Sequence, residues 1–170
     1  MVKALFLDRD GVINIEKDYL YKVEDFEFID GIFKVCKHFQ NLGYKIFVVT
    51  NQSGIARGYY SENDFKELTI WMINEFKKLG IDISKVYYCP HHPDITGTCE
   101  CRKPKPGMLL EAASEFDIDL NNSIMIGDKE RDIEAGLNAG LEKTYLYDQN
   151  NSSLESKATK VINNLEELIC

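Results

Sequence analysis

The sequence has no long apolar run, and nothing in it approaches the roughly 18 uninterrupted apolar residues of a membrane-spanning helix. We therefore expect no membrane partner. The apolar start, Met1 to Leu7, stops at Asp8 and is too short for a secretory signal. Disorder is excluded as well, because 44% hydrophobic and 28% charged residues are ordinary for a globular protein. The expectation is a single domain over residues 1–170, monomeric and cytoplasmic.

Positive charge is also scarce. The chain has 20 Lys and Arg against 28 Asp and Glu, which gives a formal net charge of -8. Such a surface repels phosphate backbones and makes nucleic acid an improbable partner, although a local basic pocket can still hold a small anion. Internal repeats and low-complexity tracts are absent from the sequence, so nothing predicts a repeat architecture or a linker.

Short apolar runs that end in polar turns alternate with amphipathic helical patterns. The apolar runs are 3–7, 45–50, 85–89, 123–126 and 143–146. Four helices are expected: one from Ile32 that stops at Gly43, one that begins with a capping box of Ser61 and Asp64, one that begins at Pro106, and one over 133–139. Residues 149–157 read as a surface loop before a short terminal helix. This alternation predicts an α/β fold with a doubly wound, mostly parallel sheet.

Polar residues collect where the predicted strands end, which is where ligands bind in such sheets. Asp8 and Asp10 flank the tip of the first strand, and Thr50 follows the second. Lys103 adds a positive charge, and Asp128 a further carboxylate. Two neighbouring carboxylates repel each other unless a cation compensates, so the pattern favours a divalent metal and a bound phosphoryl group.

These motifs, Asp8 to Asn14, Val49 to Gln52, Lys103, and Gly127-Asp128 followed by Asp132, resemble those of the haloacid dehalogenase superfamily of phosphohydrolases. The resemblance implies that Asp8 is the nucleophile and Asp10 the general acid and base. It also implies that Mg²⁺ binds the Asp8 and Asp128 side chains and the Asp10 carbonyl, and that Thr50 and Lys103 hold phosphoryl oxygens. Lys129 and Asp132 would tune the metal or touch substrate.

A second cluster consists of Cys89-Pro90-His91-His92-Pro93 and Cys99-Glu100-Cys101. Five cysteines without a secretory signal argue against a disulfide framework. Three thiolates and one imidazole form a closed tetrahedral zinc site of the Cys₃His type. Spacing alone allows either His91 or His92. The predicted zinc is structural and holds in place the loop that carries Arg102 and Lys103.

This loop narrows the resemblance to the D-glycero-D-manno-heptose 1,7-bisphosphate phosphatases and the related histidinol-phosphate phosphatases, and selects His91 as the zinc ligand. The stretches 25–31, 50–58, 87–93 and 101–108 run closer to the heptose branch. The resemblance implies hydrolysis of the C7 phosphate, with substrate contacts from Tyr19, Thr50, Asn51, Gln52, Ser53, Arg102, Lys103 and Lys129. Two departures are a short loop between His92 and Cys99 and Asp18 where glycine is common.

Two alternatives remain. One is a phosphatase for histidinol phosphate or another small phosphomonoester. The other is a non-enzymatic phosphoacceptor of the receiver type, which also gathers acidic residues, a Thr and a Lys at strand ends. Asp10 and the zinc loop argue against the receiver, because a receiver needs neither. No insertion is long enough for a separate cap domain, so we expect an open site bordered by short loops.

Overall fold

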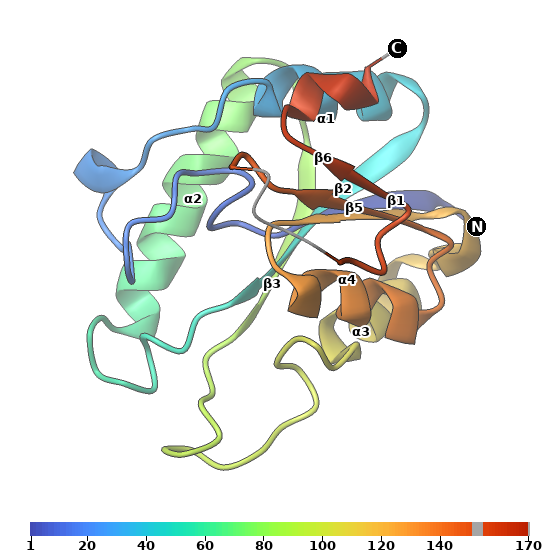
Figure 1. Cartoon of the computed structure of the whole chain (residues 1–170). Helices are drawn as coiled ribbons and strands as arrows, with labels where there is room; N and C mark the ends of the chain where they lie inside the picture. Colours follow the sequence, from blue (N-terminus) through green and yellow to red (C-terminus); the bar gives the residue numbers. More distant parts are fainter. Residues whose placement is uncertain (151–154, 170) are drawn as a thin grey trace.

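The computed structural model describes residues 1–150 and 155–169 (Figure 1). Its strands form a six-stranded sheet in the order β3-β2-β1-β4-β5-β6, and every neighbouring pair is parallel. The strands are β1 (Lys3–Leu7), β2 (Tyr44–Asn51), β3 (Ile83–Cys89), β4 (Ile124–Gly127), β5 (Lys143–Tyr147) and β6 (Lys160–Ile162). The predicted α/β class is confirmed, and β1 lies between β2 and β4.

Helices cover both faces of the sheet, as Figure 1 shows. They are α1 (Ile32–Asn41), α2 (Glu62–Lys78), α3 (Gly107–Phe116) and α4 (Glu130–Ala139), with short 3-10 turns η1 (Val23–Asp25), η2 (Leu120–Asn122) and η3 (Leu165–Leu168). Alternate residues of β1 face opposite sides. Leu5 and Leu7 pack with α1, α2 and η3, whereas Ala4 and Phe6 pack with α3 and α4. The sheet is therefore buried on both faces, as its apolar strands require.

Local signals explain the helix boundaries. The Ser61 side chain accepts a hydrogen bond from the Asp64 amide at 3.0 Å, and the Asp64 carboxylate accepts one from the Ser61 amide at 2.9 Å. The expected capping box is thus formed with Asp in place of the usual Glu. Gly43 follows α1 with φ +91°, a left-handed conformation that glycine adopts without a steric penalty.

The structure corrects the sequence analysis in two places. Helix α4 begins at Glu130, before the predicted start at Ile133, because Asp132 caps it through the backbone amides of Asp128 and Lys129. Strand β6 was not expected, and the terminal helix is the 3-10 turn η3. Of the predicted loop at 149–157, residues 151–154 lie outside the described residues, and so does Cys170.

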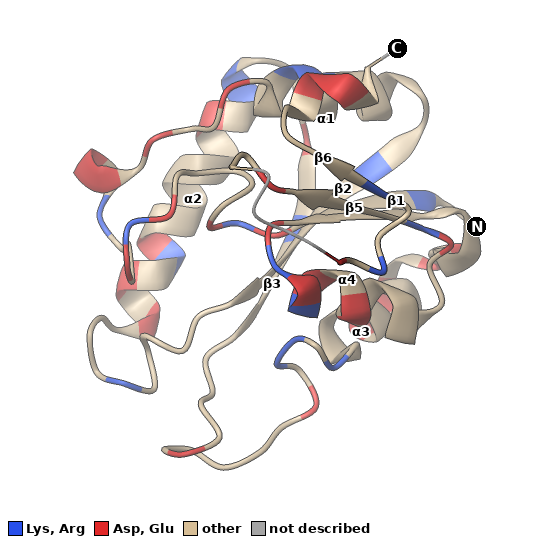
Figure 2. Cartoon of the chain, in the orientation of Figure 1, with Lys and Arg blue, Asp and Glu red and all other residues tan. Residues whose placement is uncertain are grey.

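Three loops rise from the carboxyl ends of the strands. The β1–α1 loop (8–31) contains η1, and the β2–α2 loop (52–61) and the β3–α3 loop (90–106) contain neither helix nor strand. Charged residues lie mainly on loops and helices, and the sheet is mostly uncharged (Figure 2). Among the described residues, no helix is both long and apolar enough to cross a membrane.

Candidate active site

The ends of β1, β2 and β4 bring the predicted strand-end residues together. Asp8 is the first residue after β1, and its amide donates to Ile126 of β4 at 3.1 Å. The residue is 7% exposed, and its Oδ1 accepts hydrogen bonds from the Arg9 amide and the Lys103 ammonium, each at 2.9 Å. Burial raises the pKa of Asp8 well above its usual range, and the Asp132 carboxylate adds to the rise, whereas Lys103 opposes it.

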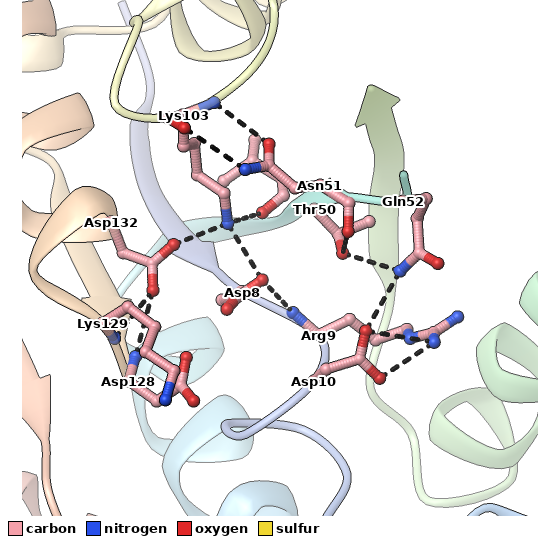
Figure 3. Close-up of polar contacts among 11 residues, drawn as sticks. Asp8, Arg9, Asp10, Thr50, Asn51, Gln52, Lys103, Asp128, Lys129 and Asp132 are labelled. Carbon is pink, nitrogen blue, oxygen red and sulfur yellow. Dashed lines mark hydrogen bonds and ion pairs between the residues drawn. The ribbon is translucent and has the colours of Figure 1, made fainter. Parts of the chain in front are cut away.

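Lys103 lies at the centre of the site, as Figure 3 shows. Its Nζ is 2.9 Å from Asp8, 2.7 Å from an Asp132 oxygen and 2.8 Å from the Val49 carbonyl. The Asn51 side chain clamps the Lys103 backbone, accepting from its amide at 3.0 Å and donating to its carbonyl at 3.3 Å. Burial alone would lower the pKa of Lys103, but the two carboxylates hold it above its usual value. The ammonium is therefore a fixed positive charge beside Asp8.

Asp10 points into a different part of the site. Its carboxylate accepts hydrogen bonds from Arg9 at 2.9 Å, Asn14 at 3.0 Å and Gln52 at 3.1 Å. Arg9, 1% exposed, also donates to the Leu20 carbonyl at 3.0 Å, so it ties Asp10 to the β1–α1 loop. The sequence analysis did not single out Arg9, although an arginine between two aspartates is a signal for such a contact.

Gly11 allows Asp128 to approach the Asp8 to Asp10 segment. Gly11 has φ +89°, and a Cβ atom there would lie 2.0 Å from an Asp128 carboxylate oxygen. Only glycine therefore fits at this position, because it has no Cβ to clash with Asp128 and it adopts the left-handed backbone without a steric penalty.

Replacing Gly11 with alanine should displace Asp128 from the site. For the phosphohydrolase activity that the sequence resemblance implies, we expect kcat/KM for phosphate release to fall on the order of 10²-fold, since a 1 Å misplacement costs that much, and the magnesium concentration for half-maximal activity to rise. The matched control is Gly43→Ala, because Gly43 has φ +91° but no atom within 4 Å of the place that a Cβ would take. Equal losses in the two variants would contradict the proposed steric cause.

The carboxylates can hold a divalent cation. One oxygen each from Asp8, Asp128 and Asp132 lies within 4.8 Å of the others, and carboxylate oxygens are the ligands that Mg²⁺ prefers. Asp132 is fully buried, ion-paired with Lys103 and bonded to two backbone amides. Its oxygens are thus engaged by the protein, so Asp8 and Asp128 are the carboxylates that fit the cation, as the sequence resemblance implies.

A cavity of about 410 Å³ opens beside Asp10. The predicted substrate residues on its wall are Tyr19, Asn51, Gln52, Ser53, Arg102 and Lys129, whereas Thr50 is buried and bonded to Gln52 at 2.9 Å. Asp18 and Tyr19 have φ of +36° and +61°, so the position where glycine is common is left-handed in this chain too.

The wall also carries cations that the sequence analysis did not place there. They are Arg57, from the β2–α2 loop, and Arg131, from the first turn of α4. With Arg102 they make three guanidinium groups around one cavity. Guanidinium groups bind phosphate through paired hydrogen bonds. The wall also carries the Asp10, Glu16 and Asp18 carboxylates, but with Lys129 its four cations outnumber them, so the arginine side is suited to an anionic group.

The cysteine cluster has the geometry of a tetrahedral metal site. The Cys89 and Cys101 sulfurs each lie 3.6 Å from that of Cys99, and the His91 Nδ1 lies 3.5 Å from Cys89 and 3.3 Å from Cys101. Tetrahedral zinc with its usual bond lengths gives separations of about 3.8 Å and 3.5 Å. Burial opposes ionisation of Cys99, but the Arg102 amide and neighbouring thiols lower its pKa to about 6.

The structure also separates the two histidines. His91 lies among the thiols, whereas His92 faces the β2–α2 loop, where its Nε2 is 2.9 Å from an Arg57 nitrogen. Arg102 donates to the His91 carbonyl at 3.2 Å, which joins the cluster directly to the cavity wall.

Comparisons with known proteins agree with this geometry. A family model described as HAD-hydrolase-like matches residues 100–168. The D-glycero-alpha-D-manno-heptose-1,7-bisphosphate 7-phosphatase of Campylobacter jejuni is 54% identical, covering 98% of this chain and 94% of that protein. The corresponding beta enzyme of Helicobacter pylori is 53% identical over 87% of this chain and 85% of that protein. The solved D,D-heptose 1,7-bisphosphate phosphatase from B. bronchiseptica, complexed with magnesium and phosphate, has a TM-score of 0.84 and 29% identity, covering 96% of this chain and 93% of that one.

Proposed function

The chain belongs to the haloacid dehalogenase-like D-glycero-D-manno-heptose-1,7-bisphosphate 7-phosphatases, and we propose that it removes the C7 phosphate of the heptose bisphosphate to leave the 1-phosphate. The observation that carries the proposal is the placement of Asp8 beside Lys103, with Asp10 at the wall of a cavity lined by guanidinium groups. The receiver-type alternative is set aside, because these relatives are named as phosphatases.

In this proposal Asp8 attacks phosphorus, and the bond from phosphorus to the C7 oxygen breaks. Asp10 gives its proton to the leaving alkoxide and later takes a proton from the water that cleaves the aspartyl phosphate. Lys103 and Thr50 hold phosphoryl oxygens and stabilise the charge that spreads over them. Magnesium bound by Asp8, Asp128 and the Asp10 carbonyl would neutralise part of that charge.

The cavity wall supplies the proposed substrate contacts. Arg57, Arg102 and Arg131 line the cavity and would bind the second phosphate of the substrate. Tyr19, Ser53 and Lys129 lie on the same wall and would contact the sugar. Asn51 and Gln52 also line it, but their amide groups bond to Lys103, Asp10 and Thr50, so they act mainly by positioning those residues.

The decisive experiment compares kcat/KM for phosphate release from the alpha and beta anomers of heptose 1,7-bisphosphate and from histidinol phosphate, in the presence of magnesium. We expect a strong preference for one heptose anomer, with the 1-phosphate as product. A preference for histidinol phosphate would overturn the substrate assignment and favour the alternative suggested by the short zinc loop. A protein that releases no phosphate from any of these compounds would overturn the phosphatase proposal.

We also propose that Cys89, His91, Cys99 and Cys101 hold one structural zinc ion. His91→Ala should lose most of the bound zinc and lower the thermal unfolding midpoint by roughly 10 °C, because folding free energy is coupled to metal binding. Metal content measured by mass spectrometry and a thermal scan test this. The matched control, His92→Ala, should keep one zinc per chain, since His92 faces Arg57. If His92→Ala lost its zinc while His91→Ala kept it, the proposed ligand set would be wrong.

A further inference from the structure

Tyr60 is held rigidly beside the active site, at the end of the β2–α2 loop. Its side chain is buried, and its ring stacks on Tyr21 at 5.5 Å with an interplanar angle of 14°. Gly54 lies against the same ring, since a Cβ at Gly54 would be 2.2 Å from a Tyr60 ring carbon. The hydroxyl group therefore has little freedom to move, and it donates a hydrogen bond to Oε1 of Gln52.

This hydrogen bond fixes which way the Gln52 amide faces. Burial raises the pKa of Tyr60 to about 12, so the hydroxyl keeps its proton at neutral pH and needs an acceptor. Only the oxygen of the amide can accept. The amide nitrogen must then face the opposite way, where it donates to Asp10 at 3.1 Å and to Oγ1 of Thr50 at 2.9 Å.

The orientation matters to both recipients. Because Gln52 donates to Thr50, the Thr50 hydroxyl keeps its own proton. In this structure it donates that proton to the Asn51 carbonyl at 3.4 Å, a long hydrogen bond that it would give up to donate to a phosphoryl oxygen. If the amide were reversed, Oε1 of Gln52 would face the Asp10 carboxylate and repel it. The same oxygen would accept the Thr50 proton, which would then be lost to a phosphoryl oxygen. Gln52 is 3% exposed, so water has little access to replace the lost hydrogen bonds.

We propose that Tyr60 is a positioning residue, which acts through Gln52 to hold Asp10 and Thr50 in the arrangement that phosphoryl transfer requires. This inference rests on the proposed phosphatase function. It makes Tyr60 part of the phosphoryl-transfer machinery although its hydroxyl contacts neither Asp10 nor Thr50 directly.

The test is a double-mutant cycle with Tyr60→Phe and Gln52→Met, measured as kcat and KM for phosphate release. Tyr60→Phe alone should lower kcat about 3- to 10-fold, as expected for one hydrogen bond, with KM changed less than about 2-fold. In the Gln52→Met background the same change should cost less than about 2-fold. Equal losses in both backgrounds, or no loss in Tyr60→Phe alone, would overturn the inference.

A second variant keeps the test independent of how well Tyr60→Phe folds. Gln52→Glu can still accept from Tyr60 but cannot donate to Asp10 or Thr50, so kcat should fall at least 10-fold. Wild-type kcat in this variant would overturn the inference. Tyr21→Phe is the matched control, since it keeps the stacked ring and should retain kcat within about 2-fold.

The cycle is run with the heptose bisphosphate and in parallel with p-nitrophenyl phosphate. If the wild-type protein hydrolyses p-nitrophenyl phosphate but not the heptose bisphosphate, the substrate assignment is overturned. The Tyr60 cycle can then still be measured with p-nitrophenyl phosphate. If the wild-type protein hydrolyses both substrates and the effects of Tyr60→Phe and Gln52→Met on kcat simply multiply, the Tyr60 inference is overturned and the substrate assignment stands.

Discussion

Asp8→Asn should abolish phosphate release, lowering kcat by about 10⁴-fold or more, because an amide cannot form the acyl phosphate and the reaction has no other nucleophile. Burial, and then repulsion from the Asp132 carboxylate, raise the pKa of Asp8, so its charge is costly to hold there and the neutral amide should fold as well as the wild type. Steady-state phosphate release and a thermal scan measure the two effects separately.

The control for Asp8→Asn is Asp82→Asn. Asp82 is exposed and precedes the amino end of β3, opposite the carboxyl ends that carry the site, so its replacement should leave kcat within about 2-fold. Full phosphate release by purified Asp8→Asn would rule out the nucleophile assignment.

Asp10→Asn is expected to be the milder change, with a loss in kcat of about 10²- to 10⁴-fold, because a general acid and base assists the reaction without forming a bond to phosphorus.

Lys103→Met should damage both stability and activity. Lys103 is the only side-chain cation bonded to the buried Asp8 and Asp132 carboxylates among the described residues. Removing one partner of a buried ion pair costs about 3–5 kcal/mol, since the remaining charge is left uncompensated. Activity should fall about 10³-fold, because the charge that stabilises phosphoryl oxygens is lost as well. Urea unfolding and phosphate release measure these effects.

Two further variants test whether the loss of stability and the loss of activity in Lys103→Met have separate causes. Lys85→Met removes a surface ion pair with Glu115 and should cost less than about 1 kcal/mol. Adding Asp132→Asn to Lys103→Met should restore part of the stability, because the asparagine oxygen can still accept from the Asp128 and Lys129 amides, but should restore no activity. If activity returned with stability, Lys103 would be a structural residue and its proposed phosphoryl contact would be wrong.

The sequence was most informative where a strand ends in polar residues. Parallel strands meet at one edge of the sheet, so the grouping of Asp8, Thr50 and Asp128 follows from the pattern alone. The apolar faces of α1 and α2 follow from their periodicity in the same way. The sequence analysis assigned Lys103 to the site but did not predict its contact with Asp8, which spans 95 residues, because nothing local sets where the β3–α3 loop returns.

The features that were missed depend on packing between distant segments or on unusual local signals. Strand β6 was missed because it has only three residues, Lys160–Ile162, and its two β-branched residues are too short a run to predict a strand. The start of α4 was misplaced because Lys129 occupies the cap position and Asp132 supplies the capping oxygen. Tyr60 carries no motif, and its role depends on how Gln52, eight residues away, is oriented.

The position of β1 between β2 and β4 separates the proposed nucleophile from the residues that line the cavity. Asp8 follows a strand that is hydrogen-bonded on both sides, so its position is set by the interior of the sheet. The cavity is bordered by loops, which tolerate replacement far better than strands do. Transplanting the β1–α1 and β2–α2 loops from another phosphatase of this fold is therefore a direct route to new substrate specificity with the catalytic sheet unchanged.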